Sequence, residues 1–292
     1  MPLTAYLKQL EPALSAVISA LTHSATQIAR QIRTSTGQKT GTQNSFDEEQ
    51  LALDVQADQI IFAELKKTQT VFAAASEETA QTTKLTDKGK FVVGFDPLDG
   101  SSLVDVNLAV GTIFGIWPGQ TFQQQTGANL LAAGFFVYGP RTTLVLTCAD
   151  TPNEFTLQLN GNWELTRPNL TIKEGKMFAP GNLRACAENP AYQELVNTWI
   201  QERYTLRYSG GMVPDINQIL LKGQGVFSYP APAKLRLVFE CAPLAKIIEA
   251  AGGQSSNGRQ SILKLPITEL NERVPVCLGS KMEVAKFEKL LA

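Results

Sequence analysis

The stretch FVVGFDPLDGSS, residues 91–102, places two acids directly after an apolar run and follows them with a turn of small residues. Residues 91–95 are rich in β-branched and aromatic side chains, which favours a strand. Asp96 falls at the end of this strand, and Asp99 follows a Pro-Leu turn. Open α/β sheets place ligand sites where strands end. The stretch therefore predicts an α/β protein with an active site at this position.

A second pair of acids, Glu77 and Glu78, follows another apolar run at residues 71–75. Clustered carboxylates without His or Cys favour Mg²⁺ or Mn²⁺. The Asp-Gly-Ser-Ser turn at residues 99–102 offers backbone N–H groups and hydroxyls, and a helix starting there would make a phosphate cradle. Each motif alone is also compatible with solvated acids or an ordinary turn. Together they indicate metal-assisted phosphoester hydrolysis.

The composition excludes several other classes of protein. The 292 residues are 43% apolar and 18% charged with a net charge of −1, so a basic nucleic-acid surface is not expected. No apolar stretch approaches the roughly 20 residues that cross a bilayer, so no membrane partner is expected either. The N-terminal residues lack the pattern of a secretory signal or an Arg-rich transit peptide. We expect a cytoplasmic protein, with a plastid location as the alternative.

The few histidines and cysteines restrict the mechanism. The chain has a single histidine, His23, which excludes His-based catalytic triads and His-rich zinc sites. Its four cysteines are widely spaced and form no Cys-x-x-Cys pair, which indicates reduced thiols.

The order of predicted elements indicates a layered α/β sandwich. Apolar spacing predicts an amphipathic helix through most of residues 7–32 and a second helix over about 49–67. Strand patterns follow at 91–95, 111–117, 132–139 and 142–148, with a hairpin over 154–166. Beyond 167–176, helices are predicted around 192–204, 213–222, 240–251 and 282–291, and strands at 225–229 and 274–278. We expect two domains, residues 1–170 and 171–292.

Four motifs together resemble the fructose-1,6-bisphosphatase superfamily of Mg²⁺-dependent, lithium-sensitive phosphatases: SEE (76–78), FDPLDGSS (95–102), VGTIFGIW (110–117) and KLRLVFE (234–240). The resemblance covers nearly the whole chain. Stretches such as EGKMFAPGNLR (174–184) and YTLRYSGGMVPDINQI (204–219) look closest to its sedoheptulose-bisphosphatase branch. The resemblance implies an αβαβα sandwich and a homodimer or homotetramer.

The resemblance implies which residues bind metal. Two or three Mg²⁺ ions, replaceable by Mn²⁺, would be held by Glu77, Glu78, Asp96, Asp99, Glu240 and the backbone carbonyl of Leu98. Glu48 and Asp54 match the acids that orient the attacking water, although the family usually has Asp where this chain has Glu48. The catalytic residues implied are therefore Glu48, Asp54, Glu78 and Asp99, with Asp54 or Glu78 as the proton acceptor.

The resemblance also implies the substrate contacts. Asp99, Gly100, Ser101, Ser102 and Arg236 match the site of the phosphate that is cleaved. Arg207, Tyr208, Tyr229 and Lys234 match the site of the distal phosphate, Asn182 and Arg184 also match family positions, and Met212 matches the residue that packs on the sugar.

The expected reaction is hydrolysis of the 1-phosphate of sedoheptulose 1,7-bisphosphate. The segment between Tyr229 and Lys234 is shorter than in fructose bisphosphatases, which favours a longer substrate. Fructose 1,6-bisphosphate, dual specificity, an inositol-monophosphatase-type activity and a non-catalytic sugar-phosphate binding protein are the alternatives. Inhibition by AMP is not expected, because the Gly-Thr-Gly-Glu-type helix start is missing. Redox control through residues 34–45 is excluded, because they contain no cysteine.

Overall fold

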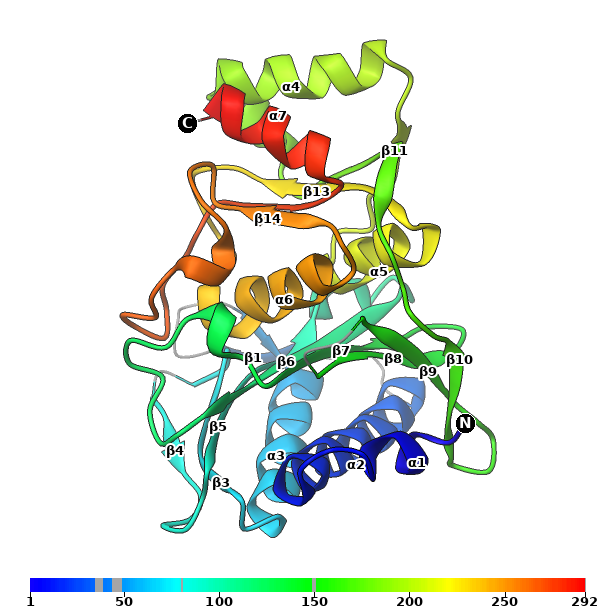
Figure 1. The fold of residues 1–292 in the computed structure, drawn as a ribbon, viewed down its shortest axis with the longest axis vertical. Helices are drawn as coiled ribbons and strands as arrows, with labels where there is room; N and C mark the ends of the chain where they lie inside the picture. Colours follow the sequence, from blue (N-terminus) through cyan, green and yellow to red (C-terminus); the bar gives the residue numbers. More distant parts are fainter. Residues whose placement is uncertain (35–38, 44–48, 80, 149–150, 292) are drawn as a thin grey trace.

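The fold is that of a five-layered α/β sandwich (Figure 1). It is seen in a computed structural model that describes residues 1–34, 39–43, 49–79, 81–148 and 151–291. Helices and sheets alternate through the molecule, so the predicted αβαβα arrangement is confirmed. Among the described helices, none is both long and apolar enough to span a bilayer.

The larger sheet has eight strands in the spatial order β10-β9-β8-β7-β6-β5-β3-β4. They are β3 (Val71–Ser76), β4 (Thr83–Lys84), β5 (Phe91–Asp99), β6 (Val110–Pro118), β7 (Ala132–Tyr138), β8 (Thr142–Thr147), β9 (Asn153–Leu157) and β10 (Trp163–Arg167). Strand β5 runs parallel to β3 and antiparallel to β6. The two acid motifs therefore lie on neighbouring strands.

Three N-terminal helices cover the outer face of this sheet: α1 (Leu3–Leu7), α2 (Pro12–Thr34) and α3 (Ala52–Lys67). The first predicted helix is interrupted, and α2 begins at Pro12, whose missing N–H is tolerated at the start of a helix. The predicted second helix starts three residues later than expected, because residues 49–51 form the short strand β2 (Glu49–Leu51), paired with β1 (Lys39–Gln43).

The middle layer consists of α5 (Met212–Lys222) and α6 (Ala242–Ala250), which lie between the two sheets (Figure 1). Their apolar faces join one core that includes Ile113 and Phe135 of the larger sheet and Phe227 of the smaller one. The helix predicted over about 240–251 begins at Ala242, because residues Leu237–Cys241 form a π-helical turn. Such turns are frequent at functional sites, and this one carries Glu240.

The smaller sheet has five strands in the order β12-β11-β13-β15-β14. They are β11 (Lys173–Pro180), β12 (Thr205–Leu206), β13 (Gln224–Tyr229), β14 (Gln254–Ser256) and β15 (Val276–Gly279), and the sheet's outer face is covered by α4 (Pro190–Gln201) and α7 (Lys281–Leu291).

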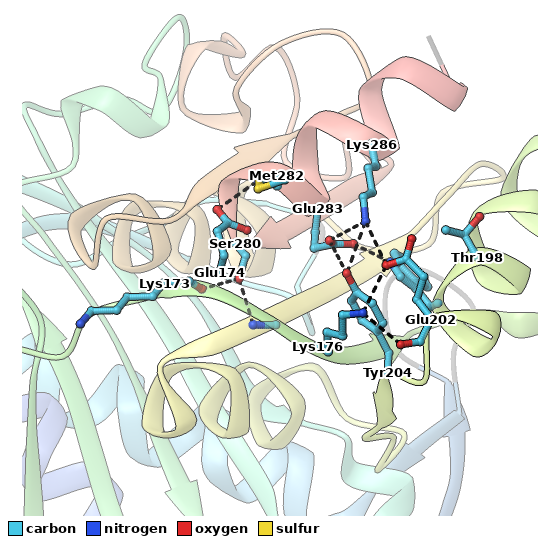
Figure 2. A network of polar contacts seen from close by, with 12 residues as sticks. Lys173, Glu174, Lys176, Thr198, Glu202, Tyr204, Ser280, Met282, Glu283 and Lys286 are labelled. Atoms are coloured by element: carbon cyan, nitrogen blue, oxygen red, sulfur yellow. Dashed lines mark hydrogen bonds and ion pairs between the residues drawn. The ribbon is translucent and has the colours of Figure 1, made fainter.

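A buried acid joins the two outer helices (Figure 2). Glu283 of α7 accepts hydrogen bonds from Trp199 Nε1 of α4 at 2.6 Å and from the Tyr204 hydroxyl at 2.7 Å. Lys286 pairs with the same carboxylate at 3.0 Å. Because the carboxylate has these partners, its burial is compensated, and the network links α4 to α7.

The decisive strand is longer than the sequence predicts. Strand β5 does not end at Phe95 but continues to Asp99, and its pairing with β6 is irregular between Asp96 and Asp99. An extra residue in one strand of a pair makes it bend, and such irregularities often lie beside active sites. The Pro-Leu segment is therefore part of a bent strand, which aims both acids toward the space between the sheets.

Candidate active site

One cavity of about 800 Å³ collects residues from both halves of the chain. Seventeen of the predicted site residues line it: Asp54, Glu77, Glu78, Asp96, Leu98, Asp99, Gly100, Ser101, Ser102, Asn182, Arg184, Tyr208, Met212, Tyr229, Lys234, Arg236 and Glu240. Arg207 is exposed and is not among the lining residues. Glu48 lies outside the described residues, so its predicted role stays a prediction.

The acidic end of the cavity holds three buried carboxylates close together. Asp96, Asp99 and Glu240 each offer one oxygen, and these oxygens lie within 4.8 Å of one another. Asp96 also accepts a 2.9 Å hydrogen bond from the Leu98 amide, which stabilises the bend of β5. Strand β5 and the π-helical turn thus bring together acids that lie far apart in the sequence.

Burial raises the pKa of all three groups, and the charges of neighbouring acids raise it further. Burial is the larger cause for Asp96, and the charges of Glu77, Asp99 and Glu240 raise its pKa further. Burial and then the charge of Glu77 raise the pKa of Glu240 well above its usual range. Burial raises the pKa of Asp99 to about 6, although two backbone amides lower it. A bound cation would reverse these shifts.

Asp99 is held by the N-terminus of α5, from the other half of the chain. Its carboxylate accepts hydrogen bonds from the Met212 amide at 3.2 Å and the Val213 amide at 2.7 Å. The first amides of a helix have no intrahelical acceptor, and the helix dipole favours a negative charge there. This contact fixes the position of Asp99 relative to α5.

Arg236 provides a buried positive charge beside the acids. Its guanidinium pairs with Glu77, and its Nε donates to Asn271 Oδ1 at 3.0 Å. The backbone amide of Arg236 donates to Glu240 Oε2 at 2.6 Å. A planar guanidinium in a fixed orientation suits carboxylate or phosphate oxygens. Arg236 therefore connects the acidic end of the cavity with a place for an anion.

The predicted phosphate loop is a single short turn. Residues Ser101–Leu103 form a 3₁₀-helix that is preceded by Gly100 with φ of +75°, in the left-handed region that favours glycine. A Cβ on Gly100 would lie 3.2 Å from the Cα of Gly211. The phosphate loop and the loop before α5 therefore touch, and the amides at the start of the turn are available to an anion.

A second part of the cavity lining is polar and less buried. Tyr229 and Lys234 line it together with Asn182, Arg184 and Tyr208. Burial raises the pKa of the Tyr229 hydroxyl, and the nearby charge of Lys234 opposes this shift. One arginine (Arg184) and one lysine (Lys234) in this part can bind a second anion, whereas acids dominate the lining around Asp96, Asp99 and Glu240.

Sequence reasoning missed three residues near the cavity. Asp215 lines it, is almost fully buried, and accepts a hydrogen bond from the Ser209 amide at 2.9 Å. Asn271 orients Arg236. Asp58 lies one helical turn after Asp54 on α3, close to Glu78. Of these three residues, only Asp58 could have been identified from the sequence, because its i+4 spacing from Asp54 places both acids on the same face of a helix.

Asp58→Asn is expected to stabilise the metal-free protein at high pH. Burial and the charge of Glu78 raise the pKa of Asp58 from 3.8 to about 6, and among described residues its Oδ1 has no hydrogen-bond partner. The folded state therefore favours the protonated acid. The stability that the protonated Asp58 carboxyl contributes to the folded state is complete below about pH 4 and is lost as the pH rises through about 6. The variant should gain about 3 kcal/mol at pH 8 and roughly half of that at pH 5.

Chelator-treated proteins should be unfolded by urea at both pH values. Asp105→Asn is the matched control, because Asp105 is exposed. A gain for Asp58→Asn that does not increase from pH 5 to pH 8 would contradict the assignment.

The acidic end fits a hard divalent cation. Its donors are all oxygens, three buried carboxylates lie within reach of one ion, and burial together with mutual repulsion raises their pKa values. Oxygen-only donor sets of this kind bind Mg²⁺, Mn²⁺ or Ca²⁺. The cluster can therefore bind a metal ion.

Two family profiles match almost the entire chain. The fructose-1,6-bisphosphatase N-terminal domain matches residues 4–168, and the fructose-1,6-bisphosphatase C-terminal domain matches residues 171–292. The chain belongs to the fructose-1,6-bisphosphatase family. The resemblance stated from the motifs is thereby confirmed.

Known members of the fructose-1,6-bisphosphatase family are similar over most of their length. A chloroplastic sedoheptulose-1,7-bisphosphatase of Triticum aestivum is 49% identical over 90% of this chain and 69% of its own. A class 1 fructose-1,6-bisphosphatase of Trichlorobacter lovleyi is 44% identical over 86% of this chain and 82% of its own. A crystal structure from Toxoplasma gondii, described as a candidate sedoheptulose-1,7 bisphosphatase, has a TM-score of 0.94 at 36% identity and covers 100% of this chain and 98% of its own.

Proposed function

We propose that this protein hydrolyses the 1-phosphate of sedoheptulose 1,7-bisphosphate to sedoheptulose 7-phosphate and inorganic phosphate. The observation that carries the proposal is the single cavity in which a metal-binding acid cluster faces basic groups from the other half of the chain. A bisphosphate fits this polarity, because one of its phosphates would lie at each end. The similarity to plant enzymes named for the seven-carbon sugar supports the choice of substrate.

The acidic end would bind two or three Mg²⁺ ions, with Mn²⁺ as a substitute. The proposed ligands are Glu77, Glu78, Asp96, Asp99, Glu240 and the Leu98 carbonyl, all of which line the cavity. When bound, the ions supply positive charge for the phosphate and lower the pKa of water to generate a nucleophile. Asp96, Asp99 and Glu240 are buried, so this charge would act in a poorly screened environment.

The chain itself would direct the proton and the phosphate. Asp54, buried at the start of α3, and Glu78, which follows β3, are the proposed proton acceptors for the attacking water, with Glu48 helping to orient it. The amides of Ser101 and Ser102 would donate to phosphate oxygens as negative charge develops. Arg236 would hold the same phosphate, because its guanidinium is already oriented by Asn271.

The other end would bind the distal phosphate. Tyr208, Tyr229 and Lys234 are the proposed contacts, with Asn182 and Arg184 beside them, and Met212 would pack against the sugar. Arg207 is kept as a proposed contact on the strength of the family resemblance, although its side chain does not line the cavity of this chain.

The ratio of kcat/KM for the seven- and six-carbon bisphosphates tests the proposal. We expect at least about a tenfold preference for sedoheptulose 1,7-bisphosphate, since one carbon more or less in a fitted pocket commonly changes the specificity by 10- to 200-fold. Phosphate release from purified protein in Mg²⁺ is the measurement, with Asp99→Asn as the inactive control. An equal or reversed ratio would assign the protein to fructose 1,6-bisphosphate or to dual specificity.

Fructose 1,6-bisphosphate is the second candidate substrate, favoured by relatives of 42–44% identity that carry that name. A non-catalytic sugar-phosphate binding protein would release no phosphate from either substrate. We also propose that the chain forms two domains, residues 1–170 and 171–292, that it assembles as a homodimer or homotetramer, and that it acts in the cytoplasm, with a plastid as the alternative.

A further inference from the structure

The loop that carries Tyr208 is attached to the rest of the protein at three points. At its start, the Arg207 amide donates to the Phe178 carbonyl of β11 at 2.8 Å. In its middle, the Ser209 amide donates to Asp215 Oδ1 at 2.9 Å. At its end, where α5 begins, the Met212 amide donates to Asp99 at 3.2 Å. The loop is therefore positioned by hydrogen bonds from its backbone.

Tyr208 is the single residue between the first two of these attachments. Its side chain lines the cavity but is 57% exposed, so packing contributes little to its position. The course of the backbone on either side decides where the Tyr208 ring lies. Of the two attachments, the one through Asp215 uses a side chain and can be removed by a point substitution without changing the strand pairing.

Asp215 is unusual for a loop-bracing residue, because it is an acid with 1% of its surface exposed. Its carboxylate also interacts with the Ser209 hydroxyl and the Gly210 amide, which partly compensate for its burial. The N-terminal turn of α5 favours its negative charge. The negative charge of nearby Asp99 acts against it. The Asp215 carboxylate is therefore held by the Ser209–Gly210 segment on one side, and its charge is influenced by both the α5 dipole and Asp99.

One helical turn therefore links the two ends of the cavity. The first amides of α5 hold Asp99 at the acidic end, and Asp215, on the same turn, holds Ser209 next to Tyr208. Gly210, with φ of +102°, and Gly211 allow the loop to turn tightly between these two contacts. The separation between Asp99 and Tyr208 therefore depends on hydrogen bonds that backbone amides donate to the Asp99 and Asp215 carboxylates.

We propose that Asp215 is a positioning residue that fixes the distance between the phosphate-cleaving end and Tyr208, so that the site selects substrates with a second phosphate at a defined distance. The inference rests on the proposed function, because it takes the cavity to bind a sugar bisphosphate. Asp215 touches neither phosphate in this scheme and acts through the Ser209 and Gly210 backbone.

The test compares a sugar bisphosphate with the matching sugar 1-phosphate, which lacks the distal phosphate. In Asp215→Ala, the ratio of kcat/KM for the bisphosphate to that for the monophosphate should fall by about tenfold or more, because a buried hydrogen-bonded acceptor is lost. The change should appear mainly in KM for the bisphosphate. In Asp215→Asn the side-chain oxygen can still accept from Ser209, so the ratio should stay within about threefold of the original.

Ser209→Ala is the second variant, chosen because Ser209 is only partly buried. It removes the hydroxyl that interacts with Asp215 and hydrogen-bonds to Gly211, and it should lower the same ratio by about fivefold. Melting curves establish that each variant is folded. If Asp215→Ala does not fold, an unchanged ratio in Ser209→Ala overturns the proposal.

Three further results would overturn it. An unchanged ratio in folded Asp215→Ala removes the positioning role. Equal losses for both substrates, mainly in kcat, would show that Asp215 acts on the cleaving end instead. A fall of the bisphosphate-to-monophosphate ratio of kcat/KM in Asp215→Asn as well as in Asp215→Ala would show that the charge of Asp215 matters and its hydrogen bond does not. A wild-type protein that releases no phosphate from any sugar bisphosphate contradicts the proposed function and this inference with it, whereas the other outcomes contradict the inference alone.

Discussion

Asp99→Asn is expected to lower kcat on the order of 10³-fold while the protein remains folded, since loss of one preorganised electrostatic contact in an active site commonly costs 10²–10³-fold. Asp99 has two functions that the amide cannot perform together. It supplies a negative oxygen to the cluster of buried acids, and both of its oxygens accept N–H groups of α5. An Asn side chain would present an NH₂ group to one of those N–H donors, which forces the cluster and the helix apart.

Phosphate release under saturating substrate and Mg²⁺ is the measurement for this variant, together with a melting curve. Asp105→Asn makes the same chemical change on an exposed residue of the following loop and should keep normal activity. Near-normal activity of folded Asp99→Asn would contradict the assignment of the acidic cluster as the catalytic centre.

Removal of divalent metal is expected to abolish hydrolysis and to lower the thermal midpoint. Without a cation, Asp96, Asp99 and Glu240 repel one another in a buried space. Mg²⁺ at about 100 times its dissociation constant would stabilise the folded state by ~2.7 kcal/mol, and a gain of this size raises the midpoint by roughly 4 °C in a chain of this length.

The metal effect should also grow with pH. The pKa of Asp99 is raised to about 6, and those of Asp96 and Glu240 are raised well above their usual ranges. Groups with a raised pKa in the folded state stabilise it at low pH, and this stabilisation is lost as the pH rises. Metal-free protein should therefore lose stability from pH 5 to pH 8, and the midpoint gain from Mg²⁺ should be larger at pH 8. Differential scanning calorimetry with EDTA and with Mg²⁺ measures both effects, and a gain that is independent of pH would contradict the buried-acid site.

The order of elements could be predicted from the sequence because it depends on local patterns. Alternating and β-branched runs marked most strands of the larger sheet, and apolar spacing marked the helices of the second half. Two boundaries depended on geometry that residue type does not specify. Strand β5 extends past Asp96 through an irregular pairing with β6, and the residues before α6 form a π turn.

The acid motifs of the site could also be predicted, because metal ligands need particular residue types at particular spacings. The residues that hold these acids in place could not be predicted from the sequence. Asp99 is held by amides that lie 113 and 114 residues later in the chain, and backbone amides have no signature in a sequence. Asn271 contacts Arg236 across 35 residues and is exposed, so nothing in its local pattern separates it from a surface residue. Asp215 looks like an ordinary acid in the first turn of a helix.

The close contact of Gly100 with Gly211 limits how this site can be redesigned. A methyl group on Gly211 would lie 3.3 Å from Asp99 Oδ2 and 3.1 Å from Pro214, and one on Gly100 would meet the Gly211 Cα at 3.2 Å. Enlarging Gly100 would require the backbone at Gly211 to shift, and enlarging Gly211 would press on the Pro214 ring and on the Asp99 carboxylate, so libraries that aim at new sugar phosphates should leave both glycines unchanged. Variation is better placed in residues 231–233, where the side chains are partly or fully exposed and changes in loop length can adjust the reach of Lys234.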